Sequence, residues 1–271
     1  MEQPSTPPEE LHRLATAIRL RAVEMVSAHG LGYLGQALSS AEEFAALYSV
    51  SRAGIDRIVV SPGHYVIGAF AAAAETGLLD RQALSSYGYN DSSIDAIGGE
   101  RSPGMAYTCG SLGQGLSAAA GFTLADRLRH EHDRRTFVLI SDGELQEGQV
   151  WEAAMFAGHH ALNRLVAVID ANNSQVDGPV DTITTIEPIA QKWESFGWQA
   201  SEVDGHDAAA IYQLLQPAQT SRPQVIVCRT STRHGLNCLP DSADGHFITM
   251  SPELSQAALA ELMAELDNCN V

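Results

Sequence analysis

The chain has 271 residues, of which 45% are hydrophobic, so it is long enough to bury a sizeable core. Its 33 acidic and 16 basic residues give a formal net charge of −17, which argues against nucleic acid or an anionic membrane as a partner. No apolar run could span a bilayer, the four cysteines lack C-x-x-C spacing, and the polar, proline-rich start is unlike a signal peptide. We therefore expect a cytoplasmic protein.

Taken in chain order, the sequence alternates helical and strand patterns. Helices are expected near residues 9–27, 39–48, 64–76, 110–130, 187–195 and 207–216 and from 251 onward, with strands near 55–60, 137–140, 165–169, 199–203 and 224–229. Ser39 or Ser40 is expected to cap the second helix. Residues 1–8 are expected to form a flexible tail, 30–35, 84–105 and 230–250 loops, and 9–271 one domain. The alternation predicts an α/β fold, with a mostly parallel sheet and helices on both faces.

The stretch from Thr136 to Gly178 holds two expected strands separated by a helix. The first strand is followed by an acidic turn that contains Asp142 and Gly143, and the second leads into Asp170-Ala-Asn-Asn173, which contains Asn172. Parallel strands joined by a crossover helix have their carboxyl ends at one edge of the sheet, so Asp142 and Asn172 should meet there. Carboxylate and amide oxygens suit a hard divalent cation that also binds phosphate oxygens. The alternative is an ordinary strand–helix–strand unit with an acidic turn.

Two glycine-rich segments allow a phosphate-binding interpretation. Gly110-Ser-Leu-Gly-Gln-Gly115 precedes a helix, where free backbone N–H groups and the helix dipole favour phosphate; a plain helix-initiating turn is the alternative. Gly30-Leu-Gly-Tyr-Leu-Gly35 formally matches the dinucleotide fingerprint G-x-G-x-x-G. That fingerprint requires a preceding strand, and here a helix precedes it, so we expect no dinucleotide site.

These segments together resemble the N-terminal half of transketolases. The matching segments are Asp142-Gly143 with the later Asn172, the run from Glu144 to Met155, Gln175-Val-Asp-Gly178 and the Gly110–Gly115 turn. The resemblance implies thiamine diphosphate held through Mg²⁺ or Ca²⁺, with Asp142, Asn172 and the carbonyl of Ser174 as metal ligands. It also implies that Gly110, Ser111, Leu112 and Gly143 border the cofactor. The family usually has Gly-Asp-Gly, and Ser141 replaces the first glycine here.

The resemblance further implies roles for two histidines. His64, in Ser61-Pro-Gly-His64, stands where the family has a histidine near the diphosphate; a satisfied polar residue at a strand end is the alternative. His246, in Asp244-Gly-His-Phe247, resembles a late histidine near the cofactor phosphates and substrate. For His246 the alternative is a histidine on a surface loop.

The chain also departs from the family at its substrate-handling positions. Tyr33 stands where the family has a histidine that contacts substrate, and the segment Asp95–Arg101, where another is usual, contains none. We expect Tyr33 to donate one hydrogen bond to the bound two-carbon adduct instead. Glu147 is expected to join a carboxylate network at a subunit interface, the alternative being a solvated acidic face shared with Glu152.

The resemblance covers about residues 11 to 246, which is one half of a transketolase. It implies the N-terminal subunit of a split enzyme that transfers a two-carbon ketol unit from a small-molecule donor. Because the family's pyrimidine-binding domain supplies the glutamate that activates the cofactor, a separate subunit carrying that domain is expected, as an α2β2 assembly. Two alternatives remain open: a specialised ketol or acyl transferase with a non-sugar acceptor such as a carrier-bound thiol, and a non-catalytic cofactor-binding subunit.

Overall fold

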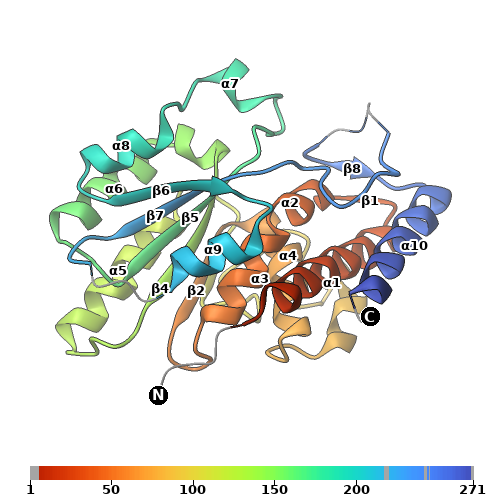
Figure 1. Cartoon of the computed structure of the whole chain (residues 1–271), viewed down its shortest axis with the longest axis horizontal. Coiled ribbons are helices and arrows are strands. Elements are labelled where there is room, and N and C mark those ends of the chain that lie inside the picture. The colour runs from red at the N-terminus through yellow and green to blue at the C-terminus, as the bar shows by residue number, and fades with distance from the viewer. Residues whose placement is uncertain (1–5, 217–219, 241–242, 244, 270–271) are drawn as a thin grey trace.

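The computed structural model describes residues 6–216, 220–240, 243 and 245–269 (Figure 1). The strands are β1 Leu31–Gly32, β2 Arg57–Pro62, β3 Tyr107–Cys109, β4 Thr136–Ser141, β5 Leu165–Ala171, β6 Gln199–Asp204, β7 Gln224–Arg229 and β8 Ile248–Thr249. The α-helices are α1 Pro8–Ser27, α2 Leu34–Ser39, α3 Ala41–Val50, α4 Val66–Glu75, α5 Gly115–Leu128, α6 Gly148–His159, α7 Val180–Ile183, α8 Ile189–Ser195, α9 Ala208–Leu215 and α10 Pro252–Asn268. Short 3₁₀ turns cover Gly63–Tyr65, Arg81–Ser86 and Gly143–Gln146.

Six strands form one sheet in the order β3-β2-β4-β5-β7-β6, and every neighbouring pair is parallel. The predicted α/β class with a parallel sheet is therefore confirmed. β1 and β8 form a separate antiparallel pair, which joins the segment after α1 to the segment before α10. No helix of the described residues is both long and apolar enough to cross a membrane.

Helices cover both faces of the sheet, as the sequence predicts (Figure 1). Alternate residues of β4 point to opposite sides: Phe137 and Leu139 join the core under α1, α3, α4 and α9, whereas Val138 and Ile140 join the core under α5, α6 and α8. All four side chains have zero exposed area. Burial of a side chain of this size contributes about 1.5–3 kcal/mol, so strands that are apolar on both faces are strongly held in the centre.

The sheet reverses its direction of winding between β2 and β4. The helix after β2 (α4) lies on one face, and the helix before β4 (α5) lies on the other. In open parallel sheets, ligands bind outside the carboxyl ends of the strands at such a reversal. His64 follows β2 and Asp142 follows β4, so the fold places both residues at that edge.

Several element boundaries differ from the sequence predictions. The expected loop at 30–35 contains β1 and the start of α2, and the loop at 230–250 contains β8. Ser40 is the N-cap residue of α3, as predicted, but its side chain makes no capping hydrogen bond. The Ser40 hydroxyl donates instead to the carbonyl of Gln36 at 2.5 Å, because α2 ends directly before α3 and presents that carbonyl. Most of the expected tail lies outside the described residues, and α1 begins at Pro8 within it.

Candidate active site

The carboxyl ends of β4 and β5 bring Asp142 and Asn172 to one edge of the sheet. Ser141 pairs with Asp170 in the parallel register, so the two strands end side by side. The Asp142 carboxylate accepts the backbone N–H of Asn173 at 2.6 Å and that of Gly143 at 2.8 Å. The predicted meeting of these two chain segments is confirmed, and Gly143 lies within the same turn.

The Asn172 amide is oriented by the groups behind it. Its Nδ2 donates to Asp170 Oδ2 at 2.9 Å and to the Tyr65 hydroxyl at 3.0 Å, while its Oδ1 accepts the N–H of Ser174 at 2.9 Å. Tyr65 and Ser39 also donate to Asp170 Oδ2. Because Asp170 holds the nitrogen side of the amide, the oxygen of Asn172 stays on the side of the turn that contains Ser174.

Two buried carboxyl groups, those of Asp142 and Asp170, lie at this edge. Burial and the neighbouring charge of Asp170 raise the pKa of Asp142 to about 7, although two backbone N–H groups oppose the rise. Burial likewise raises the pKa of Asp170, against hydrogen bonds from Ser39 and Thr230. Within the described part of the chain, neither carboxyl forms an ion pair with Arg or Lys. A divalent cation therefore fits the donor set at Asp142 and Asn172 on charge as well as on ligand type.

The glycine turn of residues 110–115 lies beside this edge and is held by Glu144, a residue whose role sequence reasoning missed. Glu144 is fully buried, and its carboxylate accepts the N–H of Gly113 and the Ser61 hydroxyl, both at 2.6 Å, and the N–H of Ser141 at 3.0 Å. Ser61 in turn accepts the N–H of Gly115 at 3.1 Å. Glu144 thus fastens the glycine turn to the ends of β2 and β4, while Gly110 and Ser111 remain exposed.

Three of the predicted site residues form one aromatic cluster. The Tyr33 ring lies 5.2 Å from that of His64 and 5.6 Å from that of His246, and the two imidazoles are 5.1 Å apart between centroids. Phe247 packs edge-on against Tyr33 at 5.0 Å. His246 is 9% exposed, and its Nδ1 lies 2.7 Å from Gln36 Nε2. It is therefore not a surface histidine, and the structure joins three residues that are far apart in sequence.

The cluster favours a neutral imidazole at its centre. Burial, followed by the repulsive charge of His246, lowers the pKa of His64 to about 3. A neutral imidazole carries one donor and one acceptor nitrogen, so His64 can orient a hydroxyl or bind a phosphate oxygen through its N–H at neutral pH. The segment Asp95–Arg101 runs past this residue, since the N–H of Gly98 donates to the carbonyl of Gly63 at 2.8 Å.

Glu147 lies apart from these groups. It precedes α6, its side chain is exposed, and it makes no side-chain capping hydrogen bond. Its neighbourhood is the glycine turn, because a Cβ at Gly113 would lie 3.0 Å from Cβ of Glu147. The structure thus places Glu147 at the surface beside the exposed part of the turn, where the predicted interface role stays a prediction.

Comparison with known proteins identifies the family. Residues 11–254 match the family described as "Transketolase, thiamine diphosphate binding domain". A transketolase family protein of Sinorhizobium fredii is 37% identical over 254 residues, which cover 88% of this chain and 90% of that protein. The 6-deoxy-6-sulfo-D-fructose transketolase subunit SqwG of Clostridium sp. strain MSTE9 is 34% identical, with coverage of 94% of this chain and 97% of the subunit.

The fold agrees with that assignment. The crystal structure of transketolase from Campylobacter jejuni superimposes with a TM-score of 0.80 at 23% identity, over 96% of this chain and 48% of that one. The chain therefore spans about half the length of that full transketolase and nearly the whole of the Clostridium subunit. Family match, relatives and fold together show that the chain belongs to the transketolase family and carries its thiamine diphosphate-binding domain.

Proposed function

We propose that the chain is the cofactor-binding subunit of a split transketolase-like enzyme that moves a two-carbon ketol unit from a small-molecule donor to an acceptor. The observation that carries the proposal is the convergence at one sheet edge of Asp142 and Asn172 with the cluster of Tyr33, His64 and His246, which Tyr65 joins by contacting both Asn172 and His64. The first pair supplies metal and phosphate ligands, and the cluster supplies proton donors and acceptors for hydroxyl groups. The cytoplasm is the proposed location.

Asp142, Asn172 and the carbonyl of Ser174 would hold Mg²⁺ or Ca²⁺ and, through it, the diphosphate. Gly110, Ser111 and Leu112 would border the diphosphate with their backbone groups, and His64 and His246, which both lie beside Tyr33, would face the substrate end of the site. Thiamine diphosphate, when bound, supplies the carbanion chemistry that transfers the ketol unit. The residues of this chain bind and orient the diphosphate and position protons at the hydroxyls of the transferred unit.

The partner is proposed to be a separate subunit that carries the pyrimidine-binding half of a transketolase, in an α2β2 assembly. Support comes from length: the chain covers 97% of a relative named as a subunit but only 48% of a full transketolase chain. The exposed positions of Gly110, Ser111 and Glu147 leave the glycine turn open to such a partner. A subunit that no longer took part in cofactor chemistry would not need the Asp142–Asn172 pair, and the presence of this pair argues against a non-catalytic role.

Asp142→Ala tests this proposal. Removing one of two metal-ligand side chains should abolish binding of thiamine diphosphate with Mg²⁺ to the assembled enzyme, measured by calorimetry, while the circular dichroism of the chain is retained. Asp177→Ala is the matched control, since Asp177 is exposed in the turn that follows Ser174. Unchanged cofactor affinity in Asp142→Ala would remove the metal assignment.

A further inference from the structure

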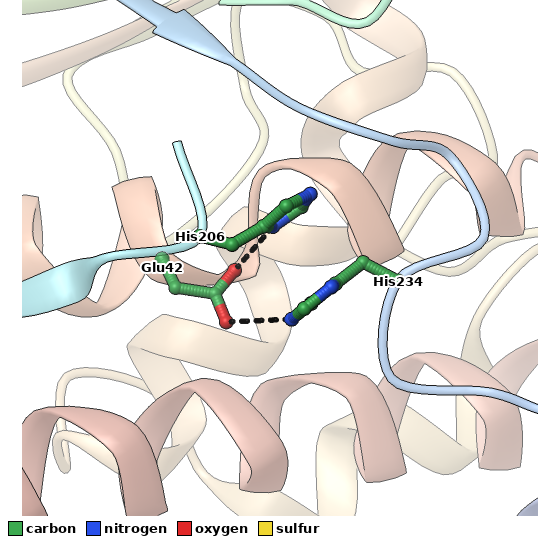
Figure 2. A group of neighbouring side chains, drawn as sticks. All are labelled: Glu42, His206 and His234. Atoms are coloured by element: carbon green, nitrogen blue, oxygen red, sulfur yellow. Dashed lines mark hydrogen bonds and ion pairs between the residues drawn. The ribbon is translucent and has the colours of Figure 1, made fainter. Parts of the chain in front are cut away.

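A second cluster of titratable side chains lies outside the candidate active site. Glu42 on α3, His206 in the turn after β6 and His234 in the loop after β7 gather within reach of one another (Figure 2). His206 Nδ1 lies 3.4 Å from Glu42 Oε2, and His234 Nε2 lies 3.9 Å from Glu42 Oε1. Each carboxylate oxygen of Glu42 thus faces one imidazole (Figure 2).

The geometry of this cluster is that of a hydrogen-bonded anchor and not of a metal site. The two imidazoles stack in nearly parallel planes, 10° apart with centroids at 3.6 Å, so a single ion cannot lie in both ring planes, where the nitrogen lone pairs point. The charge of Glu42 is already matched, because Arg19 donates to its Oε2 at 2.5 Å and both side chains are 2% exposed. Burial alone would raise the pKa of Glu42, but Arg19 and the hydrogen bond from His206 lower it to about 2.

The hydrogen bonds of His206 show which ring nitrogen donates and which accepts. Its Nε2 accepts the N–H of Ser231 at 2.9 Å, so that nitrogen is unprotonated and the proton of the neutral ring lies on Nδ1. Nδ1 therefore donates to Glu42, and His206 links the loop after β7 to α3. His234 adds its stacked ring, and burial together with the charge of Arg19 lowers its pKa to about 4, which keeps it uncharged at neutral pH.

The same loop reaches the candidate active site at its other end. Beyond His234, Gly235 packs against Arg19, where a Cβ would lie 2.8 Å from Cδ of the arginine. Further along, Gly35 at the start of α2 is so close to Gly245 that any Cβ on it would overlap the Gly245 carbonyl. The next residue is His246, at 2.7 Å from Gln36. The loop is thus attached to α2 and α3 at two points, Gln36 and Glu42.

We propose that His206 and His234 are positioning residues, which hold the loop of residues 230–246 on α2 and α3 and thereby place His246 beside Tyr33 and His64. The described residues of this loop, 230–240, 243, 245 and 246, form no helix or strand, so the loop depends on side-chain contacts to fix its position. The catalytic consequence of this anchoring rests on the proposed function, whereas the anchoring itself does not.

Hydrogen exchange on the full chain, without partner or cofactor, tests the anchoring. In His234→Ala, amides of residues 231–236 and 246–250 should exchange roughly tenfold faster, because loss of one ordinary contact shifts a local opening equilibrium by about that factor. His234→Phe keeps the stack on His206 and should restore most of the protection. His132→Ala, an exposed histidine of the loop before β4, is the control. The proposal would be overturned if, in His234→Ala, the amides around His246 exchanged as slowly as in the unmodified chain. It would also be overturned if the amides of β5 were accelerated by the same factor.

A double-mutant cycle in the assembled enzyme tests whether His234 acts through His246. His234→Ala should lower kcat, by up to about 10²-fold if His246 is displaced by an ångström, with little change in cofactor affinity. If His234 acts through His246, then His234→Ala/His246→Ala should be no slower than His246→Ala alone; additive losses would contradict the proposal. A His246→Ala enzyme of normal rate would count against the proposed role of His246 and leave the exchange result standing.

Discussion

Glu144 holds three parts of the chain around the glycine turn, and its removal should be costly. In Glu144→Ala, the N–H groups of Gly113 and Ser141 and the Ser61 hydroxyl lose a buried acceptor. An unsatisfied buried donor costs about 1–3 kcal/mol, so we expect the free energy of unfolding to fall by at least about 3 kcal/mol. Urea unfolding of the chain measures this change.

The control for this substitution is Glu152→Ala, which removes an exposed glutamate of α6 and should alter stability by less than about 0.5 kcal/mol. The loss of stability in Glu144→Gln should lie between those of Glu152→Ala and Glu144→Ala, because one oxygen acceptor is kept while the new amide nitrogen would face an N–H donor. If Glu144→Ala unfolds at the same urea concentration as the unmodified chain, Glu144 does not hold the turn.

Tyr33, in place of a histidine, leads to a second prediction, which concerns the rate of the assembled enzyme with its substrates. A phenol with a usual pKa of about 10 exchanges protons with a hydroxyl poorly at neutral pH, whereas an imidazole does so readily. The assembled enzyme should therefore be slow with ordinary ketose phosphates, and Tyr33→Phe should lose rate without losing cofactor affinity. Tyr33→His should raise the rate with xylulose 5-phosphate as donor. Rates equal to those of ordinary transketolases in the unmodified enzyme would show that the substitution is merely tolerated.

The sequence predicts that Asp142 and Asn172 meet because both follow buried strands, and parallel strands carry such residues to one edge whatever the details of packing. The sequence does not predict that Glu144 holds the glycine turn, because in the sequence Glu144 is only one residue of an acidic turn. Its main partner, Gly113, lies 31 residues earlier and approaches only when α5 docks on β2. No local pattern encodes that approach. The same holds for the His206–His234 stack, whose members come from two different loops.

At the scale of elements, helix α5 contains two glycines whose replacement by alanine should change thermal stability in opposite directions. A Cβ at Gly115 would lie 2.5 Å from Cα of Ser61, so Gly115→Ala must push the start of α5 away from β2. Nothing lies within 4 Å of a Cβ at Gly121 in the same helix, and Ala is favoured over Gly in a helix by about 0.5–1 kcal/mol. We expect Gly121→Ala to raise the melting temperature and Gly115→Ala to lower it and weaken cofactor binding.

This pair is its own control, because both changes add one methyl group to one helix. A Gly115→Ala variant as stable as Gly121→Ala would mean that α5 does not pack on Ser61 as closely as described. Thermal unfolding followed by circular dichroism distinguishes these results.

Element type follows from sequence more reliably than element ends do. The helical spacing of apolar residues predicts α1, and the proline after Ser251 predicts the start of α10, where the Ser251 hydroxyl accepts the N–H of Leu254 at 3.1 Å. The sequence predicts the N-cap position of α3 but not the partner of the Ser40 hydroxyl, because α2 occupies the preceding segment and its carbonyl at Gln36 accepts that hydroxyl. Short elements such as α2 and β8 depend on tertiary contacts and leave little periodic signal.

At the scale of the molecule, we propose that the chain carries one side of a cofactor site that a partner completes. Two cores on opposite faces of the sheet hold the strand ends rigidly, while Gly110 and Ser111 at the carboxyl edge are exposed. The fold therefore suits a subunit that is completed by another chain.

Reconstitution tests the central claim most directly. The purified chain is mixed with a separately expressed subunit that carries the pyrimidine-binding half of a transketolase, in the presence of thiamine diphosphate and Mg²⁺. Ketol transfer and the mass of the complex are measured for each component and for the mixture. We expect no transfer by either component alone, and in the mixture both transfer and a complex with two copies of each subunit. Transfer by the purified single chain at the rate of the mixture would contradict the claim.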